Sequence, residues 1–238
     1  VTITYGDSVK GTGDITDPKT ILSLQKQTRG KCQFITADGG FSYEGVEEVQ
    51  EQLITQLLFG ECVTALACGE KGSTFVCKLY DVFTMPTAKI MELVASYYEY
   101  FWFYKPETSR AANSERYLVA KNFKGISDKQ ISILLAILKK WRDTVHEKHF
   151  NPQFPKQFVT DIITPNIIDE QFRQFTHFAN NTLLTQQVNK VTEIVEISEY
   201  RVPAYMKDQQ THEQTLEKQH KYAKLWTTRY YEQLLKVK

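Results

Sequence analysis

The feature that most constrains the fold of this chain is the alternation, in its first half, of short apolar runs with longer segments of helical periodicity. The apolar runs are strand-sized and cover residues 32–37, 74–79, 100–104 and 116–120. Apolar side chains recur with helical spacing over residues 46–68 and 86–98, which separate the first three runs. Gly69 and Gly72 follow the first of these segments, as glycines commonly do where a helix ends. Such an alternation predicts a parallel sheet covered by helices on both faces.

The last two predicted strands are joined by about ten residues that show no helical pattern. This connection is too short for a crossover helix, so we expect the two strands to pair antiparallel as a hairpin. The second half of the chain is different, because helical patterns cover residues 128–147, 168–188 and 210–237. The sequence therefore predicts an α/β fold, with a mostly parallel sheet and an antiparallel edge hairpin, followed by an all-helical C-terminal extension.

Composition excludes several classes of protein. The 238 residues are 42% hydrophobic and 24% charged, which excludes a disordered tail, a coiled coil and a collagen-like chain. No stretch approaches the ~18 apolar residues that span a bilayer, so we expect no membrane partner, and no leader sequence is visible. The net charge of +1 does not by itself indicate a nucleic-acid binder. Residues 201–238 nevertheless hold eight basic and four acidic side chains, a balance that can attract phosphates locally.

All four cysteines lie in the first third of the chain, at positions 32, 62, 68 and 77. Their spacing matches no CxxC metal pattern, and each lies in a run of apolar or small residues. We therefore expect reduced, buried thiols and no metal site, as is usual in an intracellular protein.

Polar residues at two predicted strands are the first candidates for a functional site. Asp38 follows the strand at residues 32–37, and Gly39 and Gly40 after it let the backbone approach a ligand closely. Lys78 lies within the strand at residues 74–79, where a buried ammonium group is costly without a partner. Each residue also has a structural interpretation. Asp38 is a common turn former before glycine, and a strand lysine can extend its charged end into solvent.

Four segments, taken together, carry a resemblance to a known family. The segments are residues 13–18 (GDITDP), 36–41 (TADGGF), 75–84 (FVCKLYDVFT) and 105–115 (KPETSRAANSE). In order and approximate spacing they resemble the FtsJ/RrmJ-like RNA ribose 2′-O-methyltransferases, and most of all the branch that makes cap 1 on messenger RNA. The resemblance implies a Rossmann-like methyltransferase sheet over residues 1–125, and residues 126–238 are then the helical extension.

The resemblance also implies roles for individual residues. The family has a Lys-Asp-Lys-Glu tetrad around the target ribose, whose last three members fall on Asp38, Lys78 and Glu115. Burial and a second lysine are then expected to lower the pKa of Lys78, so that it removes the proton of the ribose hydroxyl while the carboxylates position it. The implied cofactor is S-adenosylmethionine, with Asp14, Ile15 and Asp38 as its binding residues. A turn-forming or helix-capping role is the alternative for Asp14.

Four further positions match residues that line the capped RNA in relatives, namely Glu48, Val49, Gln50 and Asn113. For the first three, an exposed helix face is the alternative interpretation. The first lysine of the tetrad and the Gly-rich cofactor loop have no counterpart in the sequence, and the resemblance places both upstream of Val1. We therefore expect the chain to be part of a longer polypeptide, and residues 1–238 alone to bind S-adenosylmethionine weakly.

The function implied by the resemblance is 2′-O-methylation of the first transcribed nucleotide of capped mRNA, from cap 0 to cap 1. Two alternatives remain, namely 2′-O-methylation of rRNA or tRNA, and a non-catalytic scaffold with a methyltransferase fold. The implied partners are the capped mRNA 5′ end and other capping or transcription proteins. The expected location is intracellular: the nucleus for a cellular protein, the cytoplasm or virion for a viral one.

The C-terminal segment has no counterpart that the resemblance can interpret. Lys218, Tyr222, Trp226 and Tyr230 recur every four residues and would share a helix face, whereas Lys221 and Lys224 point elsewhere. Two interpretations remain. In the first, the aromatic side chains pack on the sheet domain and the lysines face water. In the second, the lysines extend a binding track for RNA phosphates.

Overall fold

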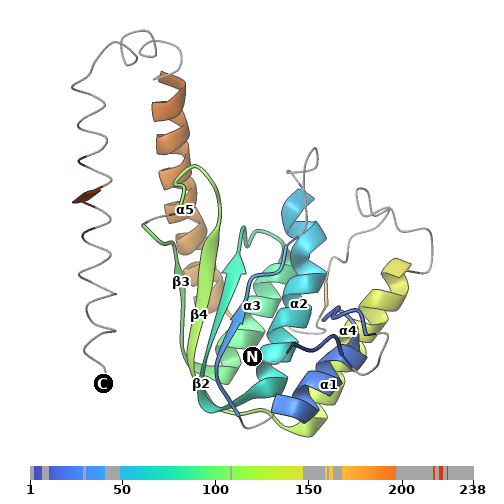
Figure 1. Ribbon diagram of the computed structural model, residues 1–238. Coiled ribbons are helices and arrows are strands. Elements are labelled where there is room, and N and C mark those ends of the chain that lie inside the picture. The colour runs from blue at the N-terminus through green and yellow to red at the C-terminus, as the bar shows by residue number, and fades with distance from the viewer. Residues whose placement is uncertain are drawn as a thin grey trace. The chain divides into compact units, whose positions relative to one another are not determined.

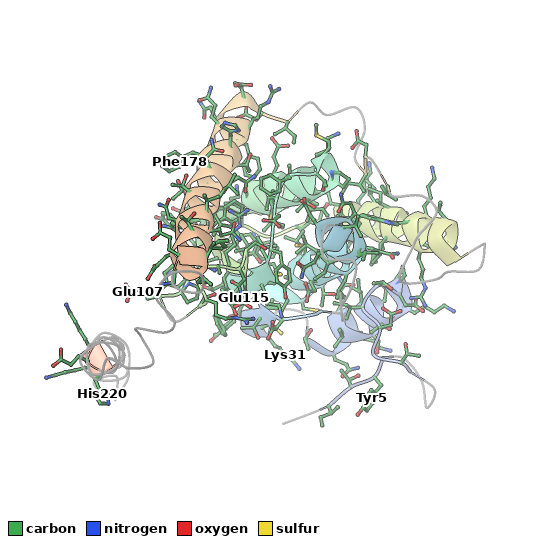
Figure 2. The ribbon with its side chains drawn as sticks, turned by 90° about the horizontal axis from the view of Figure 1, so that it is seen from above. Tyr5, Lys31, Glu107, Glu115, Phe178 and His220 are labelled. Carbon is green, nitrogen blue, oxygen red and sulfur yellow. The ribbon has the colours of Figure 1, made fainter. Side chains whose placement is uncertain are left out.

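The computed structural model describes residues 3–6, 11–28, 31–40, 49–107, 109–146, 159, 161–162 and 168–196, and positions 217, 220, 221 and 224. Figures 1 and 2 show its ribbon and its side chains. The chain forms two compact units, which we describe separately. The first unit comprises Val1–Tyr104 and Glu115–Asn181, and the second comprises Lys105–Ser114 and Thr182–Lys238. The sheet and most of the buried side chains belong to the first unit.

The described strands form a four-stranded sheet in the order β1-β2-β4-β3. The strands are β1 (Cys32–Ala37), β2 (Gly69–Leu79), β3 (Tyr98–Tyr104) and β4 (Arg116–Phe123). Strand β1 pairs parallel with β2, whereas β4 pairs antiparallel with both β2 and β3. Strands β1, β2 and β3 thus run in one direction and β4 runs against them. The predicted antiparallel hairpin at the sheet edge is confirmed, and β4 is its inner strand.

The helices that have described bounds are α1 (Pro18–Thr28), α2 (Gln50–Cys68), α3 (Met85–Tyr97), α4 (Asp128–His146) and α5 (Glu170–Glu196). Helices α2, α3, α4 and α5 match predicted segments, and nearly all of their ends differ from the prediction by four residues or fewer. The exception is the end of α5, which lies eight residues past the predicted end. Helix α1 was not predicted. Its signal was the pair Asp17-Pro18, because Asp17 accepts a hydrogen bond from the amide of Lys19 (2.9 Å) and Pro18 is the first helical residue.

Side chains alternate between the two faces of the sheet. In β2, Phe75, Cys77 and Leu79 are buried beneath α2 and α3, whereas Lys78 faces the opposite side with Val76. Helices α2 and α3 cover the same face of the sheet (Figure 1). The opposite face carries exposed aromatic side chains, namely Phe34, Tyr100, Trp102 and Tyr104. For the described residues the predicted covering of both faces by helices is therefore wrong: α2 and α3 contact the strands on one face, and α1 and α4 pack against α2.

Helix α4 belongs to the core of the first unit. The predicted apolar face of this helix is confirmed, because Ile131, Leu134, Leu135, Leu138 and Trp141 are all buried. The ring of Trp141 lies 6.0 Å from that of Phe59 in α2. The division that the sequence predicts near residue 125 stays a prediction, and α4, which follows that position, completes the core around α2.

The prediction of buried thiols is confirmed for Cys62, Cys68 and Cys77 and is wrong for Cys32, which is partly exposed; all four are free thiols. Burial raises the pKa of the Cys62 and Cys77 thiols well above the usual value, so both stay protonated. Within the described ranges, no cluster of three or more His, Cys, Asp or Glu side chains has a geometry that would hold a metal ion. The same ranges contain no helix that is both long and apolar enough to cross a membrane.

Candidate functional site

Three predicted catalytic residues meet at the edge of the sheet that is formed by the carboxyl ends of β1 and β2. Because β1 and β2 are parallel, the carboxyl ends of both strands lie at this edge, and Ala37 pairs with Cys77. Lys78 forms an ion pair with Asp38, whose side chain is 74% exposed, against 15% for Lys78. In the neighbouring antiparallel strand, Lys78 pairs with Tyr117, two residues after Glu115.

Glu115 completes this group of charges. The Tyr117 hydroxyl donates a hydrogen bond to Oε1 of Glu115 (3.4 Å), and the charge of Glu115 acts on Lys78. We call Asp38, Lys78 and Glu115 the charged triad. These three residues are the catalytic candidates that the sequence predicts, and the structure brings them together.

The charge state of Lys78 differs from the sequence-based expectation. Partial burial tends to lower the pKa of Lys78, but the hydrogen bond to Asp38 and the charges of Asp38 and Glu115 outweigh burial and raise it. The expectation of a lowered pKa is therefore wrong for this structure. The physical reason is that the carboxylates of Asp38 and Glu115 lie close enough to Lys78 to outweigh its partial burial, so its ammonium form is favoured at neutral pH.

A buried glutamate that the sequence patterns did not predict as a site residue lies beneath the Asp38 loop. Glu61 in α2 is only 5% exposed and accepts a hydrogen bond from the amide of Gly39 (2.7 Å). The Cys77 thiol donates to its other oxygen at 3.5 Å. Burial raises the pKa of Glu61, although the bonds from Gly39 and Cys77 and the charge of Lys78 oppose the shift. A glutamate within the apolar pattern of residues 46–68 was the signal that could have revealed it.

Gly39 is required by the close approach of α2 to this loop. A Cβ atom at position 39 would lie 2.6 Å from Oε1 of Glu61 and 2.8 Å from Cδ2 of Leu57. At Gly40 the nearest atom to a Cβ would be Nζ of Lys78, at 3.9 Å. The two glycines of the sequence motif therefore differ: a side chain at position 39 would clash with α2, whereas one at position 40 would not.

A cavity of about 730 Å³ opens beside the charged triad. Its lining residues include Asp14, Ile15, Ala37, Gly39, Gln56 and Glu61. Two of the three predicted cofactor-binding residues thus line the cavity. The third, Asp38, lies between lining residues Ala37 and Gly39 and directs its carboxylate to Lys78.

The chemistry of the cavity fits S-adenosylmethionine. Its volume is within the range of small-molecule sites. The buried Nε2 of Gln56 has no hydrogen-bond partner among the described residues, so a donor is left for an acceptor atom of a ligand. The carboxyl group of Glu61 also borders the cavity, on the side of Asp38 and Lys78. Gln56, Glu61 and the Asp14 loop are the residues that would hold the cofactor.

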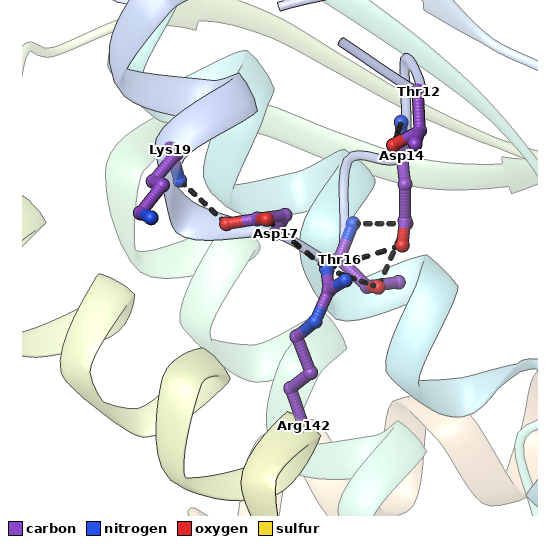
Figure 3. Close-up of polar contacts among 6 residues, drawn as sticks. All are labelled: Thr12, Asp14, Thr16, Asp17, Lys19 and Arg142. Carbon is purple, nitrogen blue, oxygen red and sulfur yellow. Dashed lines mark hydrogen bonds and ion pairs between the residues drawn. The ribbon is translucent and has the colours of Figure 1, made fainter. Parts of the chain in front are cut away.

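The loop around Asp14 is held by a network that reaches α4 (Figure 3). One carboxylate oxygen of Asp14 accepts hydrogen bonds from the amide (2.9 Å) and the hydroxyl (2.7 Å) of Thr16, and the other accepts from Arg142 at 3.1 Å. Arg142 also lies 3.6 Å from Asp17. The carboxylate of Asp14 is therefore used to shape the loop, which agrees with its alternative, turn-forming interpretation, while the residue still lines the cavity.

Three of the four predicted RNA-lining residues lie within the described structure. Val49 caps α2 and Gln50 is its first residue, both partly exposed, whereas Glu48 lies outside the described residues. Asn113 belongs to the second unit, where its carbonyl and side-chain oxygens each accept a hydrogen bond from Lys105 at 3.0 Å. Their role in RNA binding stays a prediction.

Comparison with known protein families identifies the family of this chain. The model of the FtsJ-like methyltransferase family matches residues 3–123, half of the chain. The chain belongs to the FtsJ-like methyltransferase family. The predicted resemblance is thereby confirmed, and the matched region contains the whole charged triad and the loop of Asp14.

Among the similar proteins of this family are several "Cap-specific mRNA (nucleoside-2'-O-)-methyltransferase 1" proteins. The one from Danio rerio is 33% identical over 198 residues, which are 80% of this chain and 23% of that protein. Those from Ailuropoda melanoleuca and Homo sapiens are 43% and 42% identical over 131 residues, 52% of this chain and 16% of each relative. The FtsJ-like chain thus spans less than a quarter of the length of these relatives.

Proposed function

We propose that this chain forms the catalytic part of an enzyme that methylates the ribose 2′-oxygen of the first transcribed nucleotide of capped mRNA, converting cap 0 to cap 1. The observation that carries the proposal is the charged triad beside the cavity of about 730 Å³. The names of the relatives support the choice of capped mRNA as the substrate. The FtsJ-like family supports S-adenosylmethionine as the methyl donor.

In the proposed reaction, the bond from methyl to sulfur breaks as the bond from methyl to the 2′-oxygen forms, and the hydroxyl loses its proton. Bound S-adenosylmethionine supplies the methyl group on a positively charged sulfur. The Lys78 ammonium donates a hydrogen bond to the 2′-oxygen and stabilises the negative charge that develops there. The adjacent carboxylates of Asp38 and Glu115 accept the released proton.

The protein contributes to this reaction by position and by charge. Glu61 holds the Asp38 loop through the amide of Gly39, and Ala37 and Gly39, on either side of Asp38, line the cavity. The acceptor oxygen and the methyl donor would therefore approach each other at the ends of β1 and β2. We further propose that Val49, Gln50, Glu48 and Asn113 contact the capped RNA. An intracellular location follows from the proposed substrate.

Two other functions predict different results. An rRNA or tRNA methyltransferase would use the same charged triad on an uncapped RNA, and a scaffold would transfer no methyl group to any RNA. The cap-specific function is favoured because residues 108–115 (TSRAANSE) resemble the cap branch more than the rRNA branch, and because the similar proteins named above are cap-specific by name.

The test uses the full-length protein and measures methyl transfer from labelled S-adenosylmethionine to three RNAs: a cap 0 RNA, the same RNA without a cap, and a tRNA. We expect methylation of the cap 0 RNA alone, at the 2′-oxygen of its first nucleotide. In the Lys78→Ala variant, activity should fall to less than about a tenth, because the charge that stabilises the reacting oxygen is lost. Since the carboxylate partner is 74% exposed, the free energy of unfolding should change by less than about 1 kcal/mol.

Lys121→Ala is the matched control, because Lys121 is an exposed lysine on the same face of the sheet, in β4. It should keep full activity. Methylation of the uncapped RNA or tRNA in preference to the cap 0 RNA would contradict the cap-specific proposal. Residual activity of Lys78→Ala above about a tenth would remove Lys78 from the reaction.

A further inference from the structure

A set of buried hydrogen bonds connects helix α5 to the strand ends that carry the charged triad. Arg116 is the first residue of β4, directly after Glu115, and is only 3% exposed. Its Nε donates to the carbonyl of Tyr80 (3.1 Å), and its Nη2 donates to the side-chain oxygen of Asn180 (2.6 Å). The guanidinium thus joins β4 both to α5 and to the loop that follows β2.

Asn180 closes this connection. Its side-chain nitrogen donates to the carbonyl of Val82 (2.7 Å), so both polar atoms of a side chain that is 8% exposed have partners. Tyr80 and Val82 belong to the loop after β2, which begins two residues after Lys78. The side-chain amide of Asn180 on α5 therefore binds the loop that follows Lys78. It also binds Arg116, which is the residue next to Glu115.

The same loop is held from its other side by α2. The buried carboxylate of Glu51 accepts hydrogen bonds from the amides of Phe83 (3.0 Å) and Thr84 (2.8 Å). The carbonyls of the loop are bound by Arg116 and Asn180, and its amides by Glu51. Polar backbone groups of this loop are thus paired with buried side chains, which restrict its movement.

Arg116 is a buried charged group, so it depends on its hydrogen bond to the neutral side chain of Asn180. Desolvation lowers the pKa of Arg116 to about 10, although the charges of Asp81 and Glu51 oppose the shift. The guanidinium also lies 4.6 Å from the ring centre of Phe103. Without Asn180, a buried N–H of a charged group and the carbonyl of Val82 would both lose their partner, a costly situation in a protein interior.

The FtsJ-like family match ends at residue 123, so α5 lies outside it. We propose that Asn180 is a positioning residue of the candidate catalytic centre, because it holds the start of β4 and the loop after β2 in the register that sets Lys78 next to Tyr117 and close to Glu115. This inference rests on the proposed function of the charged triad. The helical extension is, on this view, a structural part of the catalytic site.

The test compares Asn180→Ala and Asn180→Asp with Asn181→Ala. Asn181 is the next residue of α5 and is exposed, so it controls for changes in the helix itself. Asn180→Asp keeps the size of the side chain and an acceptor for Arg116 but loses the donor to Val82, and it remains informative if the alanine variant does not fold. Steady-state kinetics, amide hydrogen exchange of residues 79–84 and NMR titration of the Lys78 ammonium are measured for each variant.

We expect kcat to fall roughly 10- to 100-fold in Asn180→Ala, because small displacements of reacting groups have effects of that size. The KM for S-adenosylmethionine should change less than about twofold, since the cavity is lined by other residues. Exchange of residues 79–84 should be faster and the titration of Lys78 should shift. Asn180→Asp should show the same changes to a smaller extent, and Asn181→Ala should match the wild type.

A lower melting temperature with unchanged kcat and unchanged Lys78 titration would overturn the inference, because Asn180 would then only stabilise the fold. The Lys78 titration also separates this inference from the proposed function. If the full-length wild-type protein methylates no RNA, the proposed function fails. A shifted Lys78 titration in Asn180→Ala would still support the positioning role, and an unshifted one would overturn it.

Discussion

The guanidinium of Arg142 lies 3.1 Å from the carboxylate of Asp14, 128 positions earlier in the chain. This pair joins α4 to the loop that forms one wall of the cavity (Figure 3). The helical extension therefore supports the candidate site at two places: Arg142 holds the cavity loop, and Asn180 holds the strand ends beside Lys78.

For Arg142→Ala we expect the affinity for S-adenosylmethionine to fall roughly tenfold, since a charge-assisted hydrogen bond contributes about 1.5 kcal/mol. The loop of Asp14 would lose its anchor and would have to be ordered by the ligand. Isothermal titration calorimetry measures the change. Lys139→Ala, on the exposed face of the same helix, is the control and should bind as the wild type does. Equal affinity of the two variants would show that Asp14 and Thr16 shape the loop without Arg142.

The raised pKa of Lys78 predicts the pH dependence of methyl transfer. Its usual value is 10.5, and the Asp38 hydrogen bond and the nearby charges raise it, so Lys78 is an ammonium group throughout the neutral and mildly alkaline range. If the ammonium form is the active one, kcat is nearly constant between about pH 7.5 and 9.5. If the free amine were required, kcat would rise about tenfold for each pH unit in this range. Single-turnover rates on cap 0 RNA decide between these profiles.

Gly39 and Gly40 offer a matched pair of substitutions. Gly39→Ala should destabilise the protein by roughly 1–3 kcal/mol, because the new Cβ would lie within 3 Å of Glu61 and Leu57. Gly40→Ala places its Cβ 3.9 Å from the nearest atom and should change stability by less than about 1 kcal/mol. Urea denaturation measures both. Equal effects would mean that the loop moves away from α2 at little cost.

The buried carboxyl group of Glu61 predicts a change of stability with pH. Burial raises its pKa above the usual 4.5, so folding favours the protonated form. The stability contributed by this protonation is present at low pH and is lost as the pH rises through the raised pKa. Glu61→Gln stays neutral and its side-chain oxygen can still accept from Gly39. Its stability relative to the wild type should therefore increase with pH.

Urea denaturation of Glu61→Gln at pH 4.5, 6 and 8 provides the measurement. Glu196→Gln, in an exposed position of α5, is the control and should show no such trend. A constant difference between Glu61→Gln and the wild type over this range would contradict the prediction.

The basic C-terminal segment predicts a salt effect on RNA binding. Lys221 and Lys224 are exposed helical residues, whereas the aromatic positions 222, 226 and 230 and the basic positions 218 and 229 lie outside the described residues. Replacing Lys221 and Lys224 by glutamine should weaken binding of capped RNA and reduce the salt slope by about one unit for each lost phosphate contact. A double replacement of Lys129 and Lys139, both exposed in α4, removes the same charge as a control. Equal slopes for the two variants would exclude an RNA track along the C-terminal segment.

Local patterns in the sequence were sufficient for much of the fold and for the charged triad. The apolar run at residues 32–37 coincides with β1, and the short link between residues 104 and 116 correctly predicted an antiparallel hairpin. The motifs around Asp38, Lys78 and Glu115 identified residues that meet at one sheet edge, because parallel strands bring their carboxyl ends together. Such features depend on neighbours in the sequence or on the general geometry of sheets.

Only the tertiary structure decided which groups support the triad and in what charge state. Glu61, Arg142 and Asn180 approach the site from helices, and their partners lie 22, 128 and 98 positions away in the chain. The pKa of Lys78 depends on the balance between burial and two nearby carboxylates. That balance cannot be inferred from the strand pattern around Lys78. Periodicity determines which face of an element is buried, whereas hydrogen bonds and charges at a site depend on distances that are fixed when the elements pack.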